Sequence, residues 1–195
     1  MRFIIVLIML TLTVPAYSQE TKTLFGSDTE ASFVWGTEIK TTDIKGDIGS
    51  TIGFFGGALF NNAYLLGLAV GANVTHPDVN HGYFGILTQY THNPSELIHY
   101  SGQLFLGSGS TKDYERKKSS AMDNFGNTTG PGFYFIEPGV NAEINMSQQV
   151  RLIIGLSYRL VSGLDSDDDL ISKTQVTNSD FSGFHINLGV KVGKY

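Results

Sequence analysis

Between Tyr64 and Val74 the chain alternates strictly between apolar residues and small or polar residues. A strand turns successive side chains to opposite faces, so this alternation predicts a strand with one apolar face. A membrane-crossing strand needs roughly 9–11 residues, and this segment is long enough. The apolar face carries Tyr64, Leu66, Leu68, Val70, Ala72 and Val74. Gly67 and Gly71 fall on the other face, where we expect them to make room for charged neighbours.

Similar alternation recurs along the chain and predicts eight strands in total. The segment 150–160 is the clearest, with large apolar residues at every second position. The expected strands cover residues 30–41, 47–60, 63–74, 82–91, 97–108, 132–146, 150–160 and 183–192.

The connections between these segments alternate between short and longer ones. The short turns are 61–62, 93–96 and 147–149, and the other connections are 43–46, 75–80, 109–130 and 163–182. Bacterial outer-membrane barrels have short periplasmic turns at one rim and long external loops at the other. The pattern therefore predicts an all-β fold, an eight-stranded antiparallel up-and-down transmembrane β-barrel. A soluble secreted barrel of lipocalin type, with its apolar face inward, is the alternative.

The N-terminus has the features of a secretory signal. Arg2 supplies a positive charge, 3–10 an apolar core, and 16–18 a small-x-small cleavage site. We expect residues 1–18 to be a cleaved signal peptide and residues 19–195 to form one barrel domain. The chain has no cysteine, so neither a disulfide nor a lipid-modified cysteine is expected, and its net charge of −5 gives no reason to expect nucleic acid as a partner.

Four stretches carry a family resemblance: 54–57, 64–74, 135–141 and 154–159. With them the chain resembles the small eight-stranded outer-membrane barrels of Gram-negative bacteria, in the OmpA-like/OmpX-like porin superfamily. The resemblance implies an outer-membrane location, contact with outer-membrane lipid and lipopolysaccharide, and insertion by the barrel assembly machinery. That family typically ends on an aromatic residue that the machinery recognises, and Tyr195 fits. Its parity is opposite to that of the preceding apolar residues, which a bulge near Gly193 would repair.

The polar faces of the strands carry charged and amide residues that would line the barrel interior. They are Glu38, Lys40, Gln89, Gln103, Glu137, Glu143, Arg151, Arg159 and Lys191. Unpaired buried charges are costly, so we expect Arg151 and Arg159 to pair with Glu137 and Glu143 across adjacent strands. A structural polar plug is the favoured interpretation, and a narrow ion path or an active site is the alternative. Pro138 cannot donate a ladder hydrogen bond and is expected at a bulge.

The histidines do not form a recognisable site. His76 and His81 flank a loop, His92 lies near a turn, and His99 and His185 point inward, without metal-ligand spacing. His92 and Ser95 share one stretch, but it belongs to the periplasmic rim, which is the wrong side for a surface lipid hydrolase. We therefore assign no catalytic, cofactor-binding or metal-binding residue.

Two kinds of residue mark the expected surfaces. Eight aromatic residues fall near strand ends or on the outward face, as in a membrane girdle; for Phe133 ordinary sheet packing is preferred. They are Trp35, Tyr64, Tyr83, Tyr90, Tyr100, Phe133, Tyr134 and Tyr158.

The two long connections carry opposite charges. The loop 109–130 is basic at Lys112, Arg116, Lys117 and Lys118, whereas 165–169 is an acidic run, expected to be solvated.

These observations predict an outer-membrane barrel with a structural or surface-interaction (adhesin-like) role. No enzymatic activity and no cofactor are expected. A surface partner, unidentified from the sequence, would bind through the loops 109–130 and 163–182, and the chain is expected to be a monomer. A lipid A-modifying outer-membrane enzyme and a narrow pore are the alternatives.

Overall fold

The computed structural model describes residues 29–44, 47–75, 80–112, 132–164 and 177–195. The signal peptide expected at 1–18 lies outside this part of the chain and stays a prediction. No helix in the described part is long and apolar enough to cross a membrane. The elements are β1 (Ala31–Ile44), β2 (Asp47–Phe60), β3 (Tyr64–Asn73), β4 (Asn80–His92), β5 (Ile98–Lys112), β6 (Gly132–Asn145), β7 (Val150–Ser162), α2 (Asn178–Phe181) and β8 (Gly183–Gly193).

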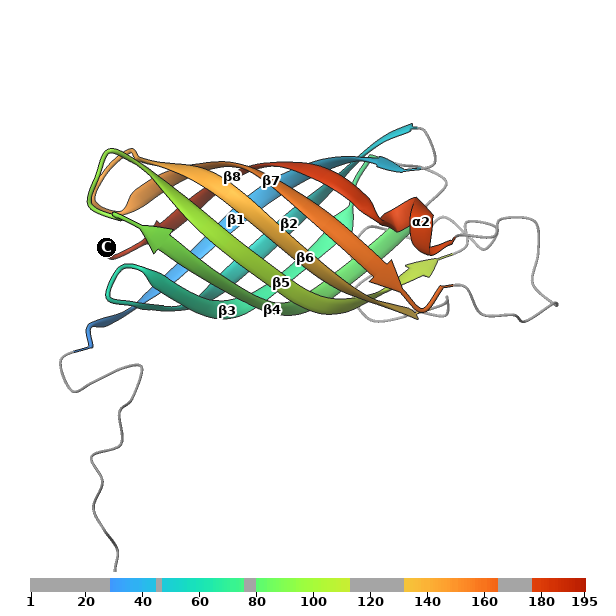
Figure 1. Cartoon of the computed structure of the whole chain (residues 1–195), viewed down its shortest axis with the longest axis horizontal. Helices are drawn as coiled ribbons and strands as arrows, with labels where there is room; N and C mark the ends of the chain where they lie inside the picture. Colours follow the sequence, from blue (N-terminus) through green and yellow to red (C-terminus); the bar gives the residue numbers. More distant parts are fainter. Residues whose placement is uncertain (1–28, 45–46, 76–79, 113–131, 165–176) are drawn as a thin grey trace, which may run out of the picture.

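The strands form one closed barrel in which each strand pairs with its neighbours in chain order. Every pairing is antiparallel, and β1 closes the barrel against β8. The three short turns and the C-terminus lie at one end, here called the turn end (Figure 1). The other connections and α2 lie at the opposite, loop end. The predicted eight-stranded up-and-down barrel is confirmed, although β5 continues to Lys112, into the region expected to be loop.

The turn between β2 and β3 contains the predicted Asn61 and Asn62, but three residues, 61–63, separate the two strands instead of two. Asn61 and Asn62 have φ values of 51° and 56°. Positive φ at both central positions defines the type I′ turn, whose twist matches that of the flanking strands, and asparagine is among the residues that adopt it readily. The N–H of Ala63 closes this turn by donating to the carbonyl oxygen of Phe60 at 3.0 Å, and the ladder begins one residue later, with Phe60 opposite Tyr64.

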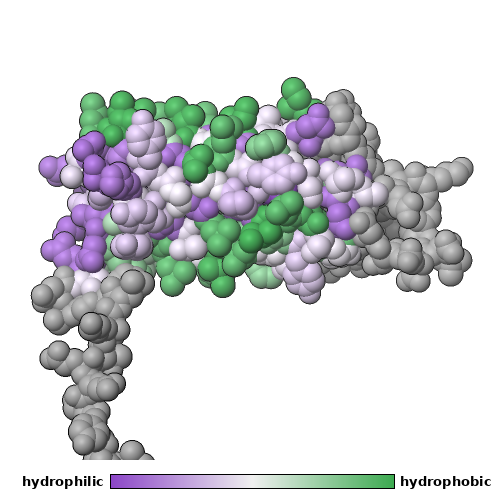
Figure 2. Space-filling view, viewed as in Figure 1, coloured by the Kyte–Doolittle hydropathy of each residue, from purple (hydrophilic) through white to green (hydrophobic). Residues whose placement is uncertain are grey.

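The exterior of the barrel is apolar and the interior is charged. Leu68 is 67% exposed and Phe184 73% exposed, whereas Lys40 is 1% exposed and Glu137 is fully buried. Apolar side chains cover much of the wall, and hydrophilic ones gather at the turn end (Figure 2). A soluble barrel of lipocalin type requires the reverse arrangement, so that alternative is wrong.

Outward-facing aromatic side chains gather near both ends of the barrel, as expected for interface girdles. Toward the turn end these are Phe33, Trp35, Tyr64, Tyr90 and Tyr100; toward the loop end they are Phe84, Tyr134, Tyr158 and Phe184. Tyr83 was expected in this set, and that expectation is wrong. It shares the inward parity of Leu87 and Gln89 in β4 and is buried inside the barrel.

The two predicted bulges are absent from the described strands. Pro138 stays in register with Leu104 of β5. On its other side the ladder to β7 lapses between Ile136 and Gly139 and resumes without an extra residue. Proline's missing donor therefore removes a hydrogen bond and leaves the strand regular. Near Gly193 the pairing with β1 is also continuous, so Tyr195 keeps its inward parity.

Several inward glycines lie directly opposite an aromatic residue on the neighbouring strand. The cross-strand pairs are Gly36–Phe55, Gly71–Tyr83, Gly107–Phe135 and Gly109–Phe133. A Cβ atom built at any of these glycines would collide with the ring of its partner. The expectation that Gly71 makes room for a charged neighbour is thus wrong, because the space is taken by Tyr83. At Gly67 the obstacle is the backbone of β2.

We predict that Gly107→Ala lowers the free energy of unfolding by about 1–3 kcal/mol. Its Cβ would meet the backbone carbonyl oxygen of Phe84 as well as the Phe135 ring, so a side-chain rotation cannot relieve the overlap. Gly102→Ala on the same strand is the matched control, since its Cβ would have open space. Urea unfolding of the protein refolded in phospholipid vesicles measures both, and equal losses would contradict the packing argument.

Candidate functional site

The charged interior is organised around two fully buried carboxylates on β6, Glu137 and Glu143. They share the inward parity of that strand, so both point into the lumen. Each binds one cationic side chain from the neighbouring β7 and one from a strand farther around the barrel, β1 for Glu137 and β8 for Glu143. We call these groups the Glu137 cluster, nearer the loop end, and the Glu143 cluster, nearer the turn end.

In the Glu137 cluster charges are balanced and the carboxylate is saturated with donors. Lys40 Nζ lies 2.6 Å from Oε1, and Arg159 donates to Oε2 from Nε at 2.7 Å, with Nη2 at 2.6 Å. Ser157 Oγ donates to Oε1 at 2.8 Å. Lys40 also lies 3.2 Å from Glu38 Oε1. Two cations thus face two carboxylates, in the short charge-assisted geometry that is strongest away from water.

In the Glu143 cluster one carboxylate serves two cations. Lys191 Nζ lies 2.9 Å from Oε2 and 3.0 Å from Oε1, while Arg151 Nη1 is 3.7 Å from Oε2. His99 Nε2 lies 3.3 Å from Oε2, and the side chains of Ser101 and Gln89 donate to Oε1. Both Glu143 oxygens are therefore occupied, while the cations outnumber the carboxylates.

The predicted adjacent-strand pairs, Arg159 with Glu137 and Arg151 with Glu143, are confirmed. The contacts of Lys40 and Lys191 with the two carboxylates were not predicted, because β1 and β8 do not pair with β6 and the contacts depend on barrel closure. Gln103 accepts a hydrogen bond from Asn141 Nδ2 at 2.9 Å.

The histidines are partly where the sequence placed them. His99 and His185 are buried and face inward as predicted. His81 was expected beside a loop, but it belongs to β4 and is buried, with its ring 4.8 Å from that of Phe181. His92 ends β4 at the turn end, and His76 lies outside the described residues. The described part of the chain holds no group of three or more histidine, cysteine or acidic residues placed to bind a metal ion.

Aromatic rings occupy the loop end of the lumen in the described part of the chain. Arg159 lies between the rings of Tyr83 and Phe135, with its guanidinium carbon 4.2 Å and 4.6 Å from their centroids. Beyond them Phe133 stacks on Phe181 of α2 at 5.5 Å. The region 163–182 was expected to be a polar loop throughout. In its described part a capped helical turn instead carries Phe181 into the barrel mouth.

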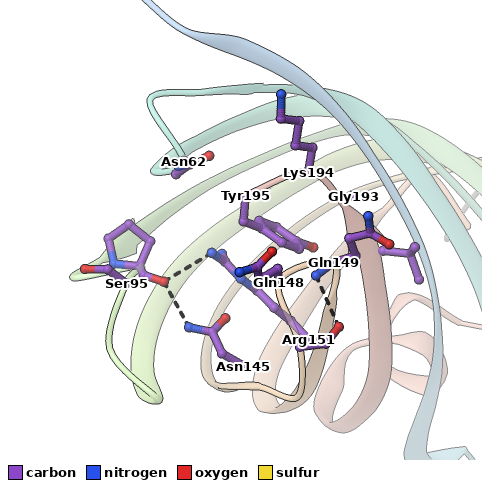
Figure 3. A pocket seen from close by; sticks show the side chains of 12 residues that line it. Asn62, Ser95, Asn145, Gln148, Gln149, Arg151, Gly193, Lys194 and Tyr195 are labelled. Carbon is purple, nitrogen blue, oxygen red and sulfur yellow. Dashed lines mark hydrogen bonds between the residues drawn. The ribbon is translucent and has the colours of Figure 1, made fainter.

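At the turn end lies an open hollow of about 890 Å³ (Figure 3). Arg151 and Tyr195 form its floor, and the guanidinium carbon of Arg151 lies 3.6 Å from the centroid of the Tyr195 ring. Arg151 Nη2 donates to the carbonyl oxygen of Pro94 at 3.2 Å, and Asn145 Nδ2 donates to the same oxygen at 3.1 Å. Ser95 belongs to the same turn, which confirms that His92 and Ser95 lie at this end.

No protein-family model matches the chain, and no curated protein matches it. Solved structures do match. Neisserial surface protein A (NspA) has a TM-score of 0.52 at 12% identity, over 84% of this chain and 97% of that one. OprG of Pseudomonas aeruginosa has a TM-score of 0.52 at 10% identity, over 86% and 97%. Ail of Yersinia pestis has a TM-score of 0.48 at 13% identity, over 84% and 97%.

This chain has the fold of the small outer-membrane barrels. The expected resemblance to them is confirmed at the level of the fold. A closed barrel with an apolar, aromatic-girdled exterior and a charged interior is the architecture of a bacterial outer-membrane protein. The apolar exterior is suited to lipid, and the closed sheet leaves no strand edge unpaired there. Closed barrels of this kind lie in the bacterial outer membrane, and this is the location of the chain.

We predict that Glu137→Gln destabilises the barrel by about 3–5 kcal/mol, the usual cost of leaving buried charges without their partner. Lys40 and Arg159 would both lose their shared carboxylate. The matched control is Glu38→Gln, whose side chain is 13% exposed and whose partner Lys40 keeps Glu137; its loss should be much smaller. Urea unfolding in vesicles gives both values, and a similar loss in the two variants would refute the central role of Glu137.

Proposed function

We propose that the chain is a monomeric outer-membrane barrel whose role is structural or surface-interacting, in the manner of an adhesin, and is neither catalytic nor conductive. The observation that carries this proposal is the filled interior. Glu137 and Glu143 bind cations inside the lumen, among them Lys40 and Lys191 from strands that do not pair with β6, and aromatic rings occupy the loop end.

A filled lumen argues against a pore. An eight-stranded barrel is just wide enough for side chains to fill its interior. Here Lys40 of β1 reaches Glu137 of β6, and Lys191 of β8 contacts both Glu143 of β6 and Gln89 of β4 on the opposite wall, so polar side-chain contacts cross the lumen at two levels. A hydrated ion would have to break these pairs in order to pass, at a cost of several kcal/mol for each buried charge left unpaired.

The same contacts argue against catalysis inside the barrel. A general acid or base must reach the proton it transfers. Both buried carboxylates are saturated with donors, and the described part of the lumen leaves no open approach to either. His92 and Ser95 lie at the turn end, away from the outer leaflet where a lipid A-modifying enzyme would work.

The connections at the loop end are the part of the chain best placed to meet a surface partner. Their sequences are long and charged, with Arg116, Lys117 and Lys118 in one and the acidic run 165–169 in another. These residues lie outside the described part, so their contribution rests on sequence alone. Basic residues there could contact lipopolysaccharide phosphates or an acidic partner.

Planar-bilayer recording and surface binding test this function together. We expect the refolded full chain to show no conductance steps. Replacing 113–131 and 165–176 with short Gly-Ser connections should abolish the attachment of displaying cells to a surface coated with an acidic polymer, which the basic residues of the first connection would contact. Heat-modifiable gel mobility should be unchanged, because the barrel wall is untouched.

Regular conductance steps would overturn the non-conducting role, and undiminished attachment of the loop-replaced protein would overturn the adhesin-like role. Mass spectrometry of lipid A from cells with and without the gene is a further check. A change in acylation would favour the enzyme alternative.

A further inference from the structure

The hollow at the turn end has no part in the function proposed above. It opens to water between the β4–β5 and β6–β7 turns, and its floor is Arg151 (Figure 3). By the orientation of outer-membrane barrels, the short-turn end faces the periplasm. A buried cation beneath an open, polar-walled hollow is an arrangement that suits an anionic ligand.

Arg151 is only partly satisfied, although it is 1% exposed. Its Nη2 donates to the carbonyl oxygen of Pro94, but Nη1 is 3.7 Å from Glu143 Oε2, too far for a hydrogen bond. Neither Nε nor Nη1 has a hydrogen-bond acceptor among the described residues. Leaving such donors unpaired costs free energy, and an acceptor supplied from outside would recover it.

The net charge of the side chains around Arg151 also indicates an anionic ligand. Arg151 and Lys191 face a single carboxylate, Glu143, so these three side chains together carry one excess positive charge. At the rim Lys194 is exposed, so its charge is screened by water. One excess charge matches a singly charged carboxylate better than a phosphate dianion, and the planar guanidinium matches a carboxylate's geometry.

Tyr195 covers this cation. Its ring lies against the guanidinium of Arg151, and its hydroxyl is buried with no hydrogen-bond partner in the described structure. Burial raises the pKa of Tyr195, so its hydroxyl stays neutral. Tyr195 follows the last ladder residue, Gly193, whose N–H donates to the carbonyl oxygen of Gln149. The ring can therefore move without breaking the β8 ladder.

We propose that the turn-end hollow binds a carboxylate carried on a peptide, and that Arg151 receives this carboxylate when the ring of Tyr195 turns aside. The walls suit a peptide carrier, because Gln148, Gln149 and Asn145 present amide groups toward the hollow. Asn145 uses its Nδ2 on the carbonyl oxygens of Pro94 and Glu96, which leaves its own carbonyl to accept from a ligand N–H. A cell-wall peptide and the tail of a periplasmic protein share this chemistry.

Calorimetric titration of the full chain in nanodiscs tests the site. The probes are N-acetyl-alanyl-alanine with a free carboxylate and the same dipeptide amidated. We expect the acid to bind at least about tenfold more tightly than the amide, as for the loss of a charge-assisted hydrogen bond. Binding of inorganic phosphate as tight as that of the acid, or equal binding of acid and amide, would overturn the assignment.

The variants move the affinity in opposite directions. Arg151→Gln should abolish binding of the acid, whereas Tyr195→Ala should tighten it several-fold by uncovering the guanidinium. Lys194→Gln, which removes an exposed cation at the rim, is the matched control and should change affinity less than about twofold. Heat-modifiable mobility verifies folding of each variant.

If Arg151→Gln does not fold, Tyr195→Ala and the comparison of acid with amide still test whether the hollow binds a carboxylate. Weaker binding of the acid by Tyr195→Ala would refute the covering role of the ring. A soluble muropeptide that binds more tightly than the dipeptide supports the site and assigns the source to the cell wall. Equal affinity also supports the site and assigns it to peptide tails. None of these outcomes bears on loop-mediated attachment, so the two proposals fail separately.

Discussion

The pairing of buried charges across the lumen is the constraint on which the rest of the barrel depends. The apolar faces of the strands are turned to lipid, so their polar faces must share a narrow interior from which most water is excluded. A charge in such a place is tolerated only with a partner of opposite sign and with its remaining hydrogen bonds made. Glu137 and Glu143 meet this condition, and each pairs with one cation from the neighbouring β7 and one from a strand that does not pair with β6.

The glycines solve the accompanying problem of space. An interior that contains arginine, lysine and several aromatic rings would be overfilled if every inward position carried a side chain. At Gly71 and Gly107 the facing strand supplies a ring that lies over the glycine, so one large side chain occupies the room of two positions. The composition of the inward faces thus reflects shared volume as much as polarity.

Much of the fold could be predicted from the sequence because it depends on local pattern. The two-residue period gave the strands and their faces, and Asn61–Asn62 gave a turn that the structure confirms. Adjacent-strand pairs such as Arg159 with Glu137 also followed from chain order. What could not be predicted depends on closure: Lys40 meets Glu137 only because β1 and β6 face the same lumen. Tyr83 was misplaced for another reason, because its position near a strand end was given more weight than the parity it shares with the inward Gln89. Phe181 was missed because a single helical turn leaves no periodic signal.

The spacing of the two carboxylates along β6 has a thermodynamic consequence. A strand rises roughly 3.3 Å per residue, so the span from Glu137 to Glu143 is about 20 Å. They share no direct partner: Lys40 and Arg159 contact one, and Lys191 and Arg151 the other. Sites this far apart with no common contact are usually energetically independent. The turn-end half of the lumen is therefore free to change its chemistry through mutation without weakening the electrostatics of the loop-end half.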